Sequence, residues 1–319
     1  METSRQLLGP ERLLMMAIEL DHAPEAVWEA IDELAEHRIE NLLEILRVAP
    51  SRSWVAGDAW HRAISAERLR LLVDSESPNL ETLERILARI ESADAGLLLD
   101  LLTESESLAT RKRLFNRLVE LAPDIGPEIM RRLHDDRWFA RRNMLVLMGE
   151  MNKWPRKWSP ADHAADSNSV VRREAFKLML KIPEHRDRAL CGLLEDRDRK
   201  TRSLGLAAAV ELCPPQAIDL LAAIVTDESV SPELRLMGVR ALGRASDSRA
   251  IGPLTELVQR GSGFGRGKLA EKSSVMLAAL QALSTRPDGT ADSRKLVARA
   301  AKSSDADVRA AVGGTEQGQ

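Results

Sequence analysis

Residues 166–179 read DSNSVVRREAFKLM, and the order of residue types in this stretch recurs along the chain. Asp166 is followed six positions later by Arg172, and small or apolar residues stand three, four and seven positions after the arginine. Such positions form one stripe of a helix with 3.6 residues per turn. The stretch therefore predicts a helix that turns its apolar face toward a core, with an aspartate just before it.

Copies of this pattern return every 30 to 37 residues. The strongest copies pair an aspartate or serine with an arginine, as in Asp136 and Arg142, Asp166 and Arg172, Asp196 and Arg202, and Ser229 and Arg235. Weaker copies centre on Arg111, Lys272 and Arg309. A fixed period of this length is typical of repeat proteins. Because the pairs recur in every unit, we interpret them as a structural ladder rather than a catalytic or ligand-binding site.

Each part of the repeat has a physical reason. An aspartate or serine before a helix predicts an N-cap, whose side-chain oxygen accepts a bond from an N–H of the first turn. A second helix precedes each predicted cap, at 189–194, 216–225, 251–258 and 294–301. A pair of short antiparallel helices cannot bury both apolar faces alone, so the pairs are expected to stack. Gly205 and Gly238 fall mid-helix, which indicates close contact between helices.

Composition supports a helical fold throughout. The chain of 319 residues contains no Tyr, only 4 Phe and 6 Trp, and is 44% hydrophobic and 30% charged. Large β-sandwiches and barrels are enriched in aromatic and β-branched residues, whereas Ala, Leu, Arg and Glu dominate here. The fold class predicted from the sequence is all-α, a superhelix of stacked antiparallel helix pairs.

The repeated aspartate–arginine pairs, with the apolar stripe behind them, resemble the HEAT-repeat family of α-solenoids over residues 94–312. The likeness is to the short bacterial form, also called the phycobilin-lyase-type HEAT-like repeat. The resemblance implies a right-handed superhelix of the HEAT/armadillo type that serves chiefly as a protein-binding scaffold. A minority of such proteins act on nucleic acid or as chromophore lyases, and both alternatives stay open here.

Residues 1–93 depart from the repeat pattern, and we interpret them as an amino-terminal cap with degenerate repeats. Helices are expected there at 11–20, 25–35, 39–48, 59–73 and 80–90. Residues 313–319 are expected to form a disordered tail. No apolar run is long enough to span a membrane, and Cys191 and Cys213 suit a reducing compartment, so a cytoplasmic protein is predicted. Both thiols are expected to be buried and inert.

Motifs for catalysis, cofactors or metals are not found in the sequence. The six histidines show no metal-ligand spacing. Four alternating glycines in 261–267 do not match a nucleotide fingerprint, and we interpret them as a loop between two helices. No convergent acid, base or nucleophile is present, so the sequence predicts a protein that is not an enzyme, with no catalytic residue, no cofactor and no metal site.

The stretch 131–158 combines cations with aromatic residues and is the candidate partner-binding region. Its candidate residues are Arg131, Arg132, Arg137, Arg141, Lys153, Trp154, Arg156, Lys157 and Trp158. Such a mixture can bind acidic peptides, phosphates or single-stranded nucleic acid. Trp138 and Phe139 are expected to pack between adjacent repeats, whereas Trp154 and Trp158 are expected to be exposed, because nearby prolines prevent a packed helix.

Charge is distributed unevenly along the chain. Residues 1–100 carry a net charge of −10 and residues 131–319 a net charge of +8, within an overall net charge of −3. The basic part is expected to bind a partner protein with an acidic surface, and nucleic acid is the less favoured partner because the whole chain is not basic. Because head-to-tail association of unlike ends would give open filaments, we predict a monomer.

Overall fold

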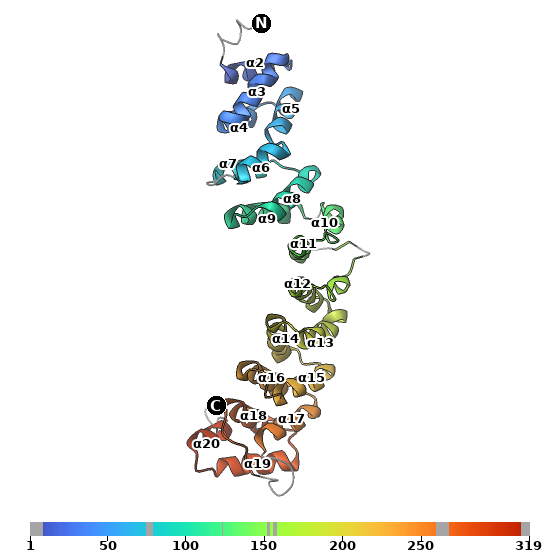
Figure 1. Ribbon diagram of the computed structural model, residues 1–319, viewed down its shortest axis with the longest axis vertical. Coiled ribbons are helices and arrows are strands. Elements are labelled where there is room, and N and C mark those ends of the chain that lie inside the picture. Colours follow the sequence, from blue (N-terminus) through green and yellow to red (C-terminus); the bar gives the residue numbers. More distant parts are fainter. Residues whose placement is uncertain are drawn as a thin grey trace. The chain divides into compact units, whose positions relative to one another are not determined.

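The computed structural model describes residues 9–74, 79–122, 124–151, 154–155, 158–259 and 268–313. In this part of the chain the regular secondary structure is helical, and the pairing of Gln259 with Leu269 is an isolated antiparallel bridge (Figure 1). The all-α prediction is therefore confirmed. Packing contacts divide the chain into two compact units, Met1–Arg156 and Lys157–Gln319, which are described separately below.

The first unit, Met1–Arg156, contains ten described α-helices. They are α2 (Pro10–Leu20), α3 (Glu25–His37), α4 (Ile39–Val48), α5 (Trp54–Ala63), α6 (Ala66–Asp74), α7 (Leu80–Leu87), α8 (Ala95–Glu104), α9 (Leu108–Leu121), α10 (Gly126–Arg132) and α11 (Trp138–Glu150). Consecutive helices pack as pairs, α8 against α9 and α10 against α11, and α9 also contacts α11. The pairs thus stack in chain order within this unit.

The second unit, Lys157–Gln319, is built in the same way. Its described α-helices are α12 (Ser169–Leu180), α13 (Arg186–Glu195), α14 (Arg199–Glu211), α15 (Ile218–Thr226), α16 (Pro232–Arg244), α17 (Ile251–Val258), α18 (Ser274–Thr285), α19 (Ala291–Ala301) and α20 (Ala306–Gly313). The second helices of successive pairs, α14, α16 and α18, pack side by side. One apolar core cluster runs from α13 to α20 and links the pairs.

Two mid-helix glycines allow these close contacts. A Cβ at Gly205 would lie 2.8 Å from the Cβ of Leu193, and one at Gly238 would lie 2.6 Å from Cγ1 of Val225. Both distances are far below ordinary carbon–carbon contact, so no larger residue fits without movement. The predicted role of both glycines in helix–helix contact is confirmed.

Between α11 and α12, the described residues contain no α-helix that could be the first helix of the pair that ends in α12. In its place lies a single 3₁₀ turn, η2 (Pro160–His163), which packs against α12. The turn is rich in proline and aspartate, which favour a short turn over a regular helix. This irregular pair begins the second unit.

One predicted helix of the first unit differs from the structure, and other expected segments can be placed along the chain. The single helix predicted at 59–73 is wrong, because the chain breaks at Ile64 and Ser65, and the Ser65 hydroxyl accepts a bond from the N–H of Arg68 in α6. The predicted boundary between 1–93 and 94–312 falls inside Met1–Arg156, between α7 and α8. Of the predicted tail 313–319, all but Gly313 lies outside the described residues, as does the glycine-rich loop 261–267.

Candidate partner-binding surface

The turn between the two helices of a pair is held by an arginine that reaches backward. Its guanidinium donates to backbone carbonyls six and five residues earlier, at 2.7–3.1 Å. The four pairs of carbonyls are Ser105 and Glu106 for Arg111, Asp135 and Asp136 for Arg141, Asp166 and Ser167 for Arg172, and Ser303 and Ser304 for Arg309. These carbonyls follow the first helix and have no helical partner. The recurring arginine therefore stabilises the turn.

The aspartates of the repeat do not occupy the N-cap, so that prediction is wrong. The caps of α12 and α14 are Asn168 and Asp198, each two residues after the repeat aspartate. The carboxylates of Asp166 and Asp196 instead accept the N–H of these cap residues, both at 2.8 Å. The repeat aspartate thus forms an Asx turn that positions the cap.

The copy predicted at Asp136 and Arg142 is displaced by one residue. Arg141 donates to the turn carbonyls, and the Asp135 carboxylate accepts the N–H of Arg137 at 2.8 Å. Arg142 donates to its neighbour Asn143. Of the predicted ladder, Asp136 and Arg142 therefore lie outside it, whereas Asp135 and Arg141 belong to it.

The ion pair between Arg172 and Asp196 links successive repeats of the second unit. Arg172 of α12 donates from Nε and Nη2 to the two carboxylate oxygens of Asp196, each at 2.8 Å. The Asp196 carbonyl also accepts from Arg202 at 3.0 Å. Burial works to raise the pKa of the Asp196 carboxyl, but bonds from Arg172 and from the Asp198 N–H outweigh it and hold that pKa below its ordinary value. This contact is structural.

Two of the predicted anchors, Arg235 and Lys272, behave differently. Arg235 donates from Nε to the carbonyl of Val225 at 2.8 Å, near the end of α15. Lys272 lies before α18, and its Nζ pairs with Asp305 at 2.7 Å and with Asp307 at 3.1 Å. The degenerate helical copy centred on Lys272 is therefore wrong, although the lysine still joins two neighbouring pairs.

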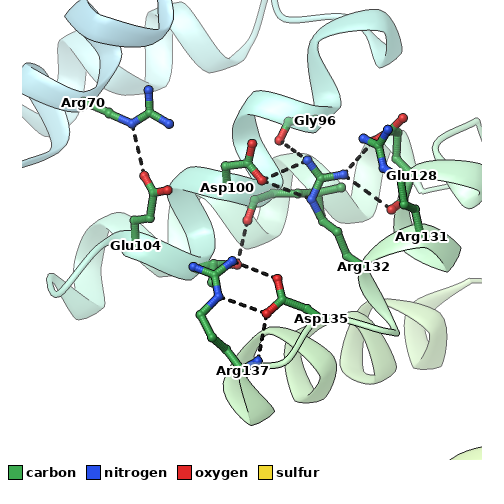
Figure 2. A network of polar contacts seen from close by, with 11 residues as sticks. Arg70, Gly96, Asp100, Glu104, Glu128, Arg131, Arg132, Asp135 and Arg137 are labelled. Carbon is green, nitrogen blue, oxygen red and sulfur yellow. Dashed lines mark hydrogen bonds and ion pairs between the residues drawn. The ribbon is translucent and has the colours of Figure 1, made fainter.

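Within the first unit, Arg132 is the centre of a polar network between α8 and α10 (Figure 2). Its guanidinium donates to the Asp100 carboxylate at 2.9 Å, to the Gly96 carbonyl at 2.9 Å and to Glu128 at 2.5 Å. The side chain is 13% exposed. Arg131 pairs with the same Glu128 at 2.5 Å. Two of the predicted partner-binding arginines are thus engaged inside the unit.

Arg137 and Arg141 are engaged as well. Arg137 pairs with Asp135 through Nη2 at 2.8 Å and Nε at 3.0 Å, and Figure 2 shows this pair beside the end of α8. The hydrogen bond from Arg137 holds the pKa of the Asp135 carboxyl at about 2. Arg70 of α6 pairs with Glu104 at 3.1 Å in the same region. The positive charges of Arg131, Arg132 and Arg137 are therefore offset by carboxylates of the same unit.

The aromatic residues of the stretch 131–158 differ in solvent exposure from the prediction. Trp138 and Phe139, in the first turn of α11, are 43% and 37% exposed, so the prediction that they pack between repeats is wrong. Their rings meet edge to face at 5.8 Å, and Arg137 lies 5.8 Å from the centre of the Phe139 ring. Two adjacent exposed aromatic side chains are unusual on a free surface and typical of interaction sites.

The two tryptophans predicted to be exposed are not. Trp154 is half-buried and donates from Nε1 to the Met148 carbonyl at 2.6 Å. Trp158 is only 9% exposed and lies against the His163 ring of η2, with a centroid distance of 6.3 Å. Lys153, Arg156 and Lys157 lie outside the described residues.

Chemistry-bearing side chains do not gather elsewhere in the described part of the chain. The described residues contain no group of three or more His, Cys, Asp or Glu side chains arranged to hold a metal ion. Cys191 and Cys213 are free and half-buried rather than fully buried as predicted, and burial raises the pKa of both thiols. No helix in the described ranges is long and apolar enough to cross a bilayer.

Comparison with known protein families agrees with the repeat geometry over part of the chain. Residues 187–270, which span α13 to α17, match the family of HEAT repeats. None of the curated protein sequences compared with the chain matches it significantly. Among solved structures, a crystal structure of the karyopherin Kap121p, bound to the extreme C-terminus of the protein phosphatase Cdc14p, aligns with a TM-score of 0.49 and 14% identity. That alignment covers 98% of this chain and 36% of the karyopherin.

The sequence match and the helix pairs describe the same units. The matched segment begins at the start of α13 and includes two complete pairs, α13 with α14 and α15 with α16. The same arginine-held turn recurs before α9, α11, α12 and α20, outside the matched segment. Residues 187–270 are thus similar to HEAT repeats, and the turns outside them are built in the same way.

Proposed function

We propose that the chain is a non-enzymatic scaffold that binds other proteins through the surface of its HEAT repeats. The observation that carries this proposal is the exposed aromatic pair Trp138 and Phe139 at the start of α11. Large aromatic side chains contribute strongly to binding when a partner buries them. Their place at a helix start held by Arg141 and Asp135 gives them a rigid base.

The charges around this pair favour a protein over a nucleic acid. Nucleic-acid affinity depends on cations free to contact phosphates. Arg131, Arg132 and Arg137 are instead paired with carboxylates, and Arg141 is bonded to carbonyls of its own turn. An acidic protein surface would likewise need cations that are not already paired. Binding of an acidic partner therefore remains a prediction for the second unit.

One observation in the second unit keeps nucleic acid as a second candidate. Lys200 of α14 and Arg240 and Arg244 of α16 are exposed and make no ion pair within the described part of the chain. These cations lie on neighbouring helices and are available to phosphates or acidic peptides. The test is oligonucleotide binding at low salt. Binding that weakens steeply with salt and is lost in Arg240→Glu with Arg244→Glu would support this alternative.

The scaffold proposal is tested by comparing what wild type and a surface variant capture from a native lysate, with quantification of each captured protein. The variant is Trp138→Ala with Phe139→Ala, and the matched control is Leu212→Ala, an exposed apolar residue of the second unit. We expect specific partners to be retained by wild type and control but lost by the double variant. Equal capture of the same proteins by wild type, the double variant and the control would show that the aromatic pair has no role in binding.

A further inference from the structure

The turns before α9 and α11 present the same two residue types at the same two positions. Five residues before the clamping arginine stands a carboxylate, Glu106 or Asp136. At the first helical position stands a large apolar residue, Leu108 or Trp138. The corresponding positions before α12 are occupied by serines, so the pattern belongs to the first unit.

All four side chains are available to a partner. Leu108 is 75% exposed and Trp138 is 43% exposed. Glu106 and Asp136 are exposed, and neither carboxylate has a hydrogen bond or ion pair to another described residue. Their backbone carbonyls are held by Arg111 and Arg141, so the carboxylates project from fixed points.

The two turns lie on one edge of the first unit. Helices α9 and α11 are in contact. The charge of Glu104, the residue directly before the first turn, raises the pKa of Arg137 in the second turn, although the main cause of that increase is the hydrogen bond with Asp135. Figure 2 likewise shows Asp135 and Arg137 beside the end of α8 that carries Glu104.

We propose that this edge binds an extended segment of a partner protein that carries lysine or arginine next to apolar side chains. The apolar side chains would cover Leu108, Trp138 and Phe139, and the cations would pair with the two free carboxylates. Charge-assisted bonds to carboxylates are strong, and an arginine or lysine also binds well over an indole ring. An acidic segment would be repelled by these two carboxylates. This inference rests on the proposed scaffold function.

The test is selection of binders to the full-length chain from a library of random peptides, followed by affinity measurements on the enriched peptides. We expect enrichment of lysine or arginine beside leucine or an aromatic residue. Affinity is expected to fall about tenfold or more in Trp138→Ala. It should fall several-fold, with weaker salt dependence, in Glu106→Gln with Asp136→Asn. Asp136→Glu, which keeps the charge, should retain binding.

Matched controls separate the edge from the rest of the surface. Asp58→Asn removes an exposed carboxylate elsewhere in the first unit, and Leu212→Ala removes an exposed apolar side chain in the second. Both should leave affinity unchanged, and all variants should keep the wild-type circular dichroism spectrum. Acidic consensus peptides, or peptides that bind Trp138→Ala as tightly as wild type, would overturn the edge while leaving the scaffold function intact. A library that yields no binder would overturn both.

Discussion

Replacing Asp196 by alanine should destabilise the protein far more than the same change at Asp136, which the sequence makes its equal. The sequence pattern treats Asp136, Asp166 and Asp196 alike, each six residues before an arginine. The structure distinguishes Asp136 from Asp196 by their contacts. Asp196 is buried, takes two bonds from Arg172 and accepts the N–H of Asp198.

The magnitudes follow from these contacts. Breaking a buried ion pair costs about 3–5 kcal/mol, but Arg172 is partly exposed and keeps its two carbonyl bonds, so the loss at Asp196→Ala should be about 2–4 kcal/mol. The exposed Asp136 carboxylate has no partner within the described residues, so Asp136→Ala should change stability by no more than about 0.5 kcal/mol.

The assay is urea denaturation followed by circular dichroism at the helical band, with the free energy of unfolding compared at a common slope. Double mutation of Asp196 and Arg172 provides the coupling energy of the pair. A loss at Asp196→Ala as small as that at Asp136→Ala would refute this difference and restore the equal-ladder interpretation.

Three further predictions concern pH, packing and association. The pKa values of Asp135 and Asp198 are held at about 2, below the unfolded value of 3.8. The stability that these two carboxylates contribute is therefore present above pH ~4 and is lost as the pH falls toward 2. In Asp198→Asn, the slope of the unfolding free energy against pH between these values should be smaller than in wild type. Gly205→Ala should destabilise the protein by about 1–3 kcal/mol through overpacking. A Cβ added at Gly57 in α5 would have no other atom within 4 Å, so Gly57→Ala should be neutral or stabilise the protein by up to about 1 kcal/mol. Thermal melts of both variants measure these changes. The chain should remain a monomer in light scattering across a concentration series at low and moderate salt, and growth at low salt that vanishes at moderate salt would contradict this.

Local features of the fold could be read from the amino-acid sequence because they depend on neighbours along the chain. The 3.6-residue stripe after Arg172 and the mid-helix glycines at 205 and 238 predicted helix pairs in close contact, and the structure confirms both. Asn168 and Asp198 were missed as caps, although their types at that distance before a helix are the ordinary cap signal.

The candidate site depended on tertiary structure. The doublets Asp135–Asp136 and Arg141–Arg142 satisfy the six-residue spacing in two registers. Adjacent residues on a helix point about 100° apart, so only one arginine can reach the turn, and the packing of α11 selects Arg141. Likewise the stretch 131–142 reads as basic in the sequence, whereas Asp100, brought to it by folding, and Glu128, one turn earlier in α10, pair with Arg132.

Sequence therefore determined the helices, their pairing and the repeat, because periodicity and backbone capping act within a few residues. Exposure and free charge were decided by tertiary structure, because each depends on which distant side chain fills the neighbouring space. Trp158 is covered by His163 of η2, and Trp138 is left exposed at the start of a helix. Which aromatic residues and carboxylates face a partner is thus a property of the packed repeats rather than of the stretch that contains them.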